Sequence, residues 1–318
     1  MPTPIKTMQI PAPPHPQKRR EPLPWHKPKP AEEDSDAPRR VDEILRSASY
    51  RQADEDPEFL SRYDVRGLRL QVDYLKPELL LEQHQIEHTI VVFGSTRIAE
   101  RGAAVRKVQQ VRAESESDPG NRVLQLRLKT AESILAKTSY YDVARELGTL
   151  IGNASATRAH HRLVVATGGG PGIMEAANRG AYDAGAKSVG FNINLPQDQF
   201  PNPYVTPELC FRFHYFALRK LHLLLRAKAL VVFPGGYGTL DELFEVLTLI
   251  QTRKIKPFPV VLVGKAFWCQ AFNIDFLVDE GVIDLEDRDL FWFAEDAGEI
   301  WDGILQWHER AGEPLLAD

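Results

Sequence analysis

Cysteine is scarce in this chain of 318 residues, which contains only Cys210 and Cys269. Two cysteines exclude a disulfide framework and a metal site built from several cysteines. No apolar run approaches the roughly 20 residues that a membrane-spanning helix requires. The first residues also lack the apolar core of a signal peptide, because proline interrupts them repeatedly. We therefore expect a cytoplasmic protein that does not act in a membrane.

Neither sign of charge is in large excess. The formal net charge of −5 gives the chain no general attraction to nucleic acid or to anionic membranes. Hydrophobic residues make up 43% of the chain and charged residues 26%, as in an ordinary globular protein. The length is sufficient for one large domain or two small ones.

Composition divides the chain into three parts. Residues 1–40 hold 11 of the 23 prolines and are too polar to bury a core, which predicts a disordered tail. This tail is either a solubilising extension or a docking arm for a partner. Residues 41–87 have helical spacing and form a predicted helical extension in which Pro77 marks a break. Residues 88–312 form the remaining predicted domain.

Short β-branched runs alternate with helical stretches in this domain. The predicted strands are 89–93, 163–167, 188–193, 229–233 and 260–263, the last clear one. The stretch 101–156 is predicted to be helical with a loop at 114–121. This alternation predicts an α/β fold, a Rossmann-like doubly wound parallel sheet with helices on both faces. Three strands end in small-residue loops, GST, GGG and PGG, at the sheet edge where such folds bind ligands.

The strongest motif is PGGYGTLDE, from Pro234 to Glu242. Two glycines follow a buried strand and precede a helix predicted to start near Thr239. Glycine lets the backbone approach a ligand closely, and a helix N-terminus attracts anions, so this loop suits a phosphate. The alternative interpretation is a plain strand-to-helix turn in which Thr239 caps the helix.

The loop from Gly168 to Glu175, GGGPGIME, repeats this design. It adds Gly169, Gly170 and Glu175 as candidate substrate-binding residues. It differs from the dinucleotide fingerprint GxGxxG, because Gly168, Gly170 and Ile173 occupy the three glycine positions. It also lacks the lysine of a GxxxxGK phosphate loop. Two such loops on one sheet edge are stronger evidence for an anion site than either alone.

A third motif, FHYFALRK from Phe213 to Lys220, lies on a predicted helix before the fourth predicted strand. Arg219 could reach a phosphate or a developing negative charge with its planar guanidinium, or it could lie on a solvated helix face. No carboxylate or cysteine pattern completes a metal site around His214 or His222, so we expect no metal.

In this order, GGGPGIMEAAN, the Arg219-Lys220 pair and PGGYGTLDE resemble the Lonely guy (LOG) phosphoribohydrolases, which activate cytokinins and have often been mislabelled as lysine decarboxylases. The resemblance covers about residues 88–310, which makes 88–312 the expected nucleotide-binding catalytic domain. The segment GFNINLP at 190–196 is similar to the longer bacterial branch, an AMP nucleosidase-like group. The family splits a nucleoside 5′-monophosphate into free base and ribose 5-phosphate.

The resemblance implies specific roles. Arg219 and Glu242 match the two catalytic residues of the family. The matching substrate-binding positions are Lys220, Gly235, Gly236, Gly238, Thr239 and Thr248. Thr248 has an alternative role as a packing residue on its helix. Asp241 points about 100° away from Glu242 on a helix, so both carboxylates are not expected to serve one site equally.

The expected substrate is therefore AMP or a prenylated AMP, with no cofactor, and Met174 and Arg97 are candidates for the base pocket. Family members are usually dimers or larger oligomers, so a homo-oligomer is expected, with no nucleic-acid or membrane partner. The main alternative is a non-catalytic nucleotide-binding or sensor protein on the same fold. A nicotinamide oxidoreductase, a pyridoxal-phosphate decarboxylase and a phosphoryl transferase are disfavoured, because their motifs are missing.

Overall fold

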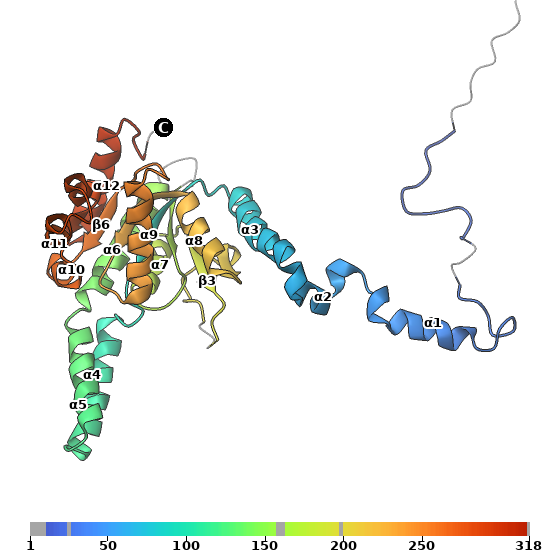
Figure 1. The fold of residues 1–318 in the computed structure, drawn as a ribbon, viewed down its shortest axis with the longest axis horizontal. Helices are drawn as coiled ribbons and strands as arrows, with labels where there is room; N and C mark the ends of the chain where they lie inside the picture. The colour runs from blue at the N-terminus through green and yellow to red at the C-terminus, as the bar shows by residue number, and fades with distance from the viewer. Residues whose placement is uncertain (1–10, 24–26, 157–162, 197–199, 317–318) are drawn as a thin grey trace, which may run out of the picture. The chain divides into compact units, whose positions relative to one another are not determined.

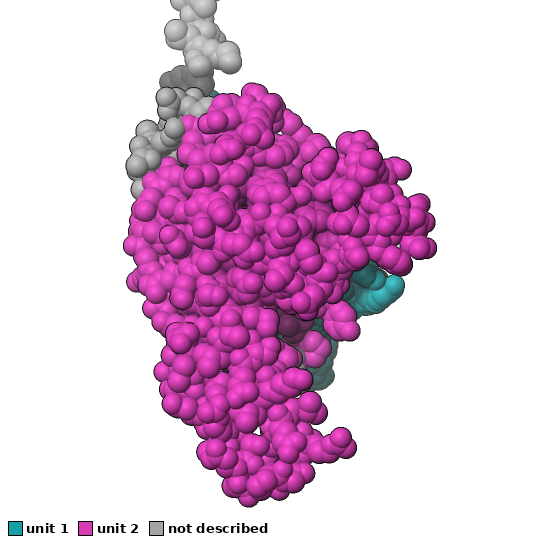
Figure 2. All heavy atoms as spheres, turned by 90° about the vertical axis from the view of Figure 1, so that its left-hand side faces the viewer, with its two compact units in different colours: residues 1–69 teal, residues 70–318 magenta. Residues whose placement is uncertain are grey.

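The computed structural model describes residues 11–23, 27–156, 163–196 and 200–316, and these divide into units at 1–69 and 70–318 (Figures 1 and 2). The smaller unit contains α1 (Ala37–Arg46), α2 (Pro57–Ser61) and the first residues of α3 (Arg66–Gln83). Short 3-10 turns connect these helices. Asp56 caps α2, because its side chain accepts hydrogen bonds from the backbone N–H groups of Glu58 and Phe59. The described residues before α1 form no helix or strand.

A seven-stranded sheet, parallel throughout, forms the centre of the larger unit. Its strands are β1 (His88–Phe93), β2 (Leu163–Thr167), β3 (Ser188–Ile193), β4 (Cys210–Phe213), β5 (Ala227–Val232), β6 (Val260–Val263) and β7 (Trp292–Ala294). Their order across the sheet is β4-β3-β2-β1-β5-β6-β7. Strands β2, β3 and β4 follow one another on one side of β1. The chain then returns to the other side of β1, where β5, β6 and β7 follow one another. This confirms the predicted Rossmann-like sheet and places its switch point between β1 and β5.

Helices cover both faces of the sheet. Ile90 and Val92 of β1 belong to one hydrophobic core, and Val91 and Phe93 belong to the other, because successive strand residues point to opposite faces. The first core includes residues of α6 (Ser139–Ala156), α7 (Ile173–Asp183) and α12 (Ala297–Arg310). The second includes residues of α8 (Phe216–Leu225), α9 (Tyr237–Gln251) and α10 (Lys265–Ala271). Helix α11 spans Ile274–Asp279.

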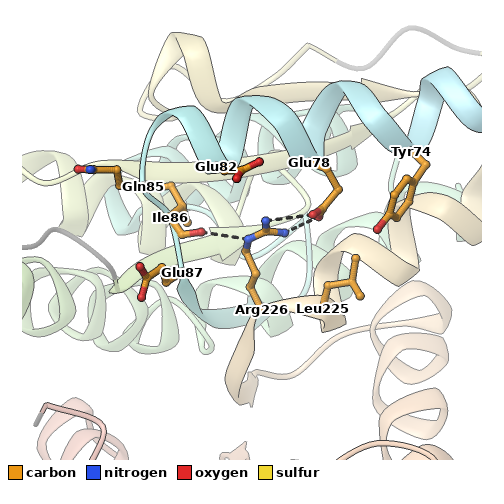
Figure 3. Close-up of a pocket in the computed structure, with 8 residues that line it drawn as sticks. All are labelled: Tyr74, Glu78, Glu82, Gln85, Ile86, Glu87, Leu225 and Arg226. Atoms are coloured by element: carbon orange, nitrogen blue, oxygen red, sulfur yellow. Dashed lines mark hydrogen bonds and ion pairs between the residues drawn. The ribbon is translucent and has the colours of Figure 1, made fainter.

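The C-terminal part of α3 belongs to the larger unit, and charged contacts hold it there (Figure 3). The Arg226 guanidinium pairs with the Glu78 carboxylate, and its Nε donates to the backbone carbonyl of Ile86 at 3.0 Å. Leu81 of the same helix is fully buried. The prediction of a break at Pro77 is wrong, because α3 runs through this residue. Pro77 is buried, so its packing offsets the backbone hydrogen bond that proline cannot donate.

Several predicted boundaries need correction. Helix α4 (Arg101–Ser117) continues three residues past Glu114, so the loop to α5 (Arg122–Leu135) is shorter than predicted. Asn121 caps α5 by accepting from the N–H groups of Val123 and Leu124.

Helices α4 and α5 lie side by side and project from the body of the larger unit (Figure 1). None of the helices in the described part of the chain is long and apolar enough to cross a membrane.

The sequence analysis missed strands β4 and β7. Both are short and lie at the two edges of the sheet, where pairing to a single neighbour defines them. Phe213 therefore belongs to a strand rather than to the predicted helix, and α8 begins at Phe216. The side chain of Asp73 accepts from the backbone N–H groups of His214 and Tyr215, which fixes the turn between β4 and α8.

Candidate functional site

The three predicted small-residue loops meet at the carboxyl ends of β1, β2 and β5. The N–H of Ser95 donates to the carbonyl of Pro234 at 2.9 Å, and the carbonyl of Ser95 accepts from the N–H of Ile173 at 3.2 Å. A Cβ at Gly172 would lie 2.4 Å from the Ser95 carbonyl oxygen, so glycine permits this close packing. The loop after β1 thus ties the two glycine-rich loops together at the switch point of the sheet.

A cavity of about 560 Å³ lies at this edge. Five of the predicted site residues line it: Arg219, Gly236, Gly238, Thr239 and Glu242. Met174 and Arg97, the candidates for a base pocket, also line it. The volume is within the range of pockets that hold a nucleotide-sized ligand. The edge predicted from the strand-loop pattern is therefore hollow and holds the charged residues of two motifs.

A buried ion pair between α8 and α9 lies in the lining of the cavity. Nη1 of Arg219 lies 3.6 Å from Oε1 of Glu242, and the two side chains are only 10% and 6% exposed. The Nε of Arg219 donates to the backbone carbonyl of Phe191 at 2.9 Å, and its guanidinium lies 5.5 Å from the centre of the Phe216 ring. Backbone and ring contacts therefore fix the guanidinium, and Arg219 does not lie on a solvated helix face.

Burial changes the ionisation of this pair. Loss of solvent raises the pKa of Glu242 to about 7, although the positive charges of Arg219 and Lys220 oppose the shift. Asp241 and Glu245 raise the pKa of Glu242 further through their negative charges. Burial also lowers the pKa of Arg219, while Glu242 and Asp241 oppose that change. The guanidinium stays protonated at neutral pH, since arginine is never deprotonated in proteins. Glu242 is thus a carboxyl group that exchanges a proton near neutral pH, as a catalytic acid or base requires.

The PGG loop places the N-terminus of α9 at the cavity. A Cβ at Gly235 would lie 2.1 Å from the Thr239 hydroxyl oxygen, whereas a Cβ at Gly236 or Gly238 would meet nothing within 4 Å. Gly235 is therefore needed for packing, and the other two glycines leave open space beside the cavity. The helix begins at Tyr237, two residues before the predicted start, with Gly236 at the capping position and no side-chain cap. Thr239 lies inside the first turn and does not cap the helix.

Hydrogen bonds within the chain hold the GGG loop, and the predicted roles of Gly169 and Gly170 in substrate binding remain predictions. Gly169 has φ +69°, which favours glycine, and its N–H donates to the Thr167 hydroxyl at 2.9 Å. The side chain of Asn202 donates to the carbonyl of Gly170 at 3.0 Å. Of the three glycines, Gly168 lines the cavity, where a Cβ would lie 2.7 Å from Nη2 of Arg219. The absence of a side chain at this position makes room for the guanidinium.

Three other predicted substrate-binding residues contact other protein groups and do not line the cavity. Glu175 accepts a hydrogen bond from the Tyr141 hydroxyl at 2.9 Å. Lys220 forms ion pairs with Asp241 and Glu245. The hydroxyl of Thr248, an exposed residue, donates to the carbonyl of Phe244 at 2.7 Å. Their predicted roles in substrate binding remain predictions.

The sequence analysis did not single out several lining residues. Phe216, Asn192 and Tyr237 line the cavity, and Tyr237 is 93% exposed at the start of α9. Each lies within a segment that the sequence analysis quoted, but no spacing rule marks it as a lining residue. Asn192 is the next-to-last residue of β3 and is buried, so the signal for it was its place near the carboxyl end of a strand.

A second cavity, of about 600 Å³, lies between α3 and the end of α8 (Figure 3). Its lining includes Glu78, Glu82, Glu87 and Arg226, and the Arg226 guanidinium pairs with Glu78. It lies away from the glycine loops and is a weaker candidate for a ligand site. Across the described ranges, no group of three or more His, Cys, Asp or Glu residues is arranged to hold a metal ion.

Comparison with known proteins identifies relatives of this chain. Residues 174–304 match a family model described as "Possible lysine decarboxylase". The chain is 28% identical over 190 residues to "Probable cytokinin riboside 5'-monophosphate phosphoribohydrolase LOGL3" of Oryza sativa subsp. japonica, covering 56% of this chain and 83% of that protein. It is 30% identical over 168 residues to "Cytokinin riboside 5'-monophosphate phosphoribohydrolase LOG1" of Arabidopsis thaliana, covering 52% of this chain and 74% of that protein.

Among solved structures, the chain is similar to the Moco carrier protein from Chlamydomonas reinhardtii. The two are 23% identical with a TM-score of 0.38, and the match covers 54% of this chain and 89% of the other.

Proposed function

Because the chain belongs to the LOG family of cytokinin riboside 5'-monophosphate phosphoribohydrolases, we propose that it hydrolyses the N-glycosidic bond of a purine nucleoside 5′-monophosphate. The products are the free base and ribose 5-phosphate. One observation carries the proposal: a buried Arg219–Glu242 pair lies in the same cavity as an uncapped helix N-terminus. A nucleotide presents the matching chemistry, a phosphate dianion separated by a ribose from a glycosidic bond.

The N-terminus of α9 is the proposed phosphate site. The first N–H groups of a helix have no carbonyl partner within the helix, and the helix dipole adds a partial positive charge there. No acidic residue occupies the first turn of α9, so no carboxylate competes with a phosphate for the first N–H groups of the helix. Gly236 and Gly238 leave space for its oxygens, and Thr239 supplies a hydroxyl at the same end.

Glu242 is the proposed acid–base group at the anomeric carbon. Cleavage of a ribosyl–base bond passes through an oxocarbenium-like state, which a nearby carboxylate stabilises. The ionised carboxylate takes a proton from the attacking water as the new C1′–O bond forms and the C1′–N bond breaks. The same proton can then pass to the departing base. A pKa of about 7 lets Glu242 both accept and release it at neutral pH.

Arg219 is the proposed electrostatic partner of the reaction. The departing base gains negative charge as its bond to ribose breaks, and a fixed guanidinium stabilises that charge. The hydrogen bond to the Phe191 carbonyl holds Arg219 in place before substrate arrives, so little reorganisation is needed during the reaction. Binding of the phosphate at α9 positions the ribose beside this pair of side chains.

The proposed substrate is AMP or N6-prenyl-AMP. Apolar side chains line part of the cavity and suit a flat base: Phe93, Met174, Ile193, Leu195 and Phe216. A prenyl group would add apolar surface against the same wall. Exposed apolar residues on the outer faces of α8 and α9, Leu221, Leu225 and Phe244, also support assembly into a homodimer or larger homo-oligomer.

The test is to incubate the purified protein with AMP and with isopentenyl-AMP in buffer containing a chelator and to follow base release by chromatography. Glu242→Gln and Arg219→Ala should each lower kcat by a factor of about 100 or more. Glu309→Gln and Arg310→Ala, exposed residues on α12, are matched controls that should retain full activity. The ratio of the two rates identifies the preferred substrate. Nucleotide binding without base release from either substrate would overturn the proposal and favour a nucleotide sensor.

A further inference from the structure

Lys220 follows Arg219 on α8, but its side chain makes a different set of contacts. Its Nζ lies 2.8 Å from Oδ2 of Asp241 and 3.0 Å from Oε2 of Glu245. The Lys220 side chain is only 17% exposed. Oε2 of Glu245 is buried and has no hydrogen bond of good geometry, so the ammonium 3.0 Å away is its counter-charge. Lys220 thus forms ion pairs with two carboxylates of the neighbouring helix.

These carboxylates flank Glu242 on α9. Two consecutive residues of α8 therefore meet three acidic residues of α9, Arg219 at Glu242 and Lys220 at Asp241 and Glu245. Asp241 and Glu245 are four residues apart and lie on neighbouring turns of the helix. Without Lys220 this stretch of α9 would carry three carboxyl groups against a single guanidinium.

We propose that Lys220 is a positioning residue, which joins α8 to α9 and neutralises the carboxylates on either side of Glu242 without contacting the substrate. This inference rests on the proposed function, in which Glu242 is the acid–base group. It differs from the role implied by the family resemblance, which places Lys220 among the substrate-binding positions. The ammonium does not line the cavity, and both of its strong contacts are internal to the protein.

The electrostatics of Glu242 support this role. The positive charges that oppose its raised pKa come from Arg219 and Lys220 of α8, and the negative charges that add to it come from Glu245 and Asp241 of α9. Arg97, from the loop after β1, lines the same cavity. Removal of Lys220 deletes one of the opposing charges and leaves two carboxylates uncompensated. The pKa of Glu242 should then rise further, and its ionised form should become scarce at neutral pH.

The experiment compares wild type with Lys220→Met, Lys220→Arg and the triple variant Lys220→Met/Asp241→Asn/Glu245→Gln. Two quantities are measured: the pH profile of kcat for AMP hydrolysis, and the Kd for ribose 5-phosphate at pH 8 by calorimetry. Lys220→Met should move the acidic limb of the profile upward by about one pH unit. Lys220→Arg, which keeps the charge, and the triple variant, which removes both carboxylates as well, should return the limb towards wild type. The Kd should change less than twofold throughout.

A tenfold weaker Kd for ribose 5-phosphate in Lys220→Met, with an unmoved acidic limb, would overturn this inference and make Lys220 a phosphate ligand. Hydrolysis by none of the proteins would overturn the proposed function instead. In that event the pH dependence of urea unfolding tests Lys220 separately. The fall in stability that accompanies ionisation of Glu242 should extend to higher pH in Lys220→Met than in wild type. Superimposable unfolding profiles would overturn the inference.

Discussion

Substitution of Glu242 by glutamine should change how stability depends on pH. Burial raises the pKa of Glu242 from the ordinary value of 4.5 to about 7, so the folded protein holds a proton that the unfolded chain has already lost. Stability must therefore fall as pH rises from about 4.5 to about 7, and it should level off above this window. Glutamine cannot ionise, so Glu242→Gln should lack this contribution.

The magnitude follows from the size of the shift. Each unit of pKa shift corresponds to about 1.4 kcal/mol. Because the pKa of Glu242 rises from 4.5 to about 7 on folding, full ionisation of this group lowers the free energy of unfolding by up to roughly 3 kcal/mol. Part of this loss has already occurred at pH 5, which leaves about 2–3 kcal/mol between pH 5 and pH 8. Wild type should lose that much more than Glu242→Gln over this interval. Glu242 is only 5% exposed, so solvent screening reduces the effect little.

The assay is urea unfolding followed by tryptophan fluorescence at pH 5, 6, 7 and 8. Glu309→Gln, an exposed position on α12, controls for the general effect of removing a carboxylate. Any pH-independent effect of the glutamine side chain on packing displaces the whole Glu242→Gln profile, so the comparison uses slopes and not absolute values. Parallel profiles for wild type and Glu242→Gln would refute the reasoning, because they would mean that Glu242 has the same pKa in the folded and unfolded states.

Three further predictions concern glycine positions and an ion pair. Gly235→Ala should disrupt the PGG loop and weaken ribose 5-phosphate binding at least tenfold, because its Cβ would lie 2.1 Å from the Thr239 hydroxyl. The Cβ of Gly236→Ala meets nothing within 4 Å, so thermal melts should show an unchanged melting temperature; calorimetry should still show weaker binding, because the methyl group takes up the space proposed for the phosphate oxygens. Glu78→Gln should lower the free energy of unfolding by about 1–3 kcal/mol, because it leaves the part-buried Arg226 without its charged partner; an unchanged urea midpoint would contradict this. Gly264→Ala should cost at least about 1 kcal/mol, because Gly264 has φ +88° and its Cβ would lie 2.4 Å from the Tyr140 hydroxyl; a melting temperature equal to wild type would count against it.

The sequence by itself determined the sheet and the edge at which the candidate site lies. The central strands β1, β2 and β5 are short runs of mainly apolar residues, and β1 and β5 are buried except at their first residues. Such runs stand out because both faces of the sheet are covered. Each ends in a loop of small residues, and parallel strands bring their carboxyl ends to one edge. Local patterns were sufficient here, since backbone geometry carries them directly into space.

The tertiary structure alone decided which charges meet. Arg219 and Glu242 are far apart in sequence, and their 3.6 Å contact depends on how α8 packs against α9. The same packing turned Lys220 towards Asp241 and Glu245 and away from the cavity. Burial, which raises the pKa of Glu242 to about 7, depends on every element around it and so has no signature in a local motif.

The same distinction explains the errors along the chain. The short edge strand β4 forms because Cys210 to Phe213 pair with β3. Helix α3 continues through Pro77, which is buried. In both places long-range contacts outweigh the local preference of the residues. Local sequence determined where the chain turns and which loops carry glycine, and the packing of distant helices determined which side chains share a buried, low-dielectric environment.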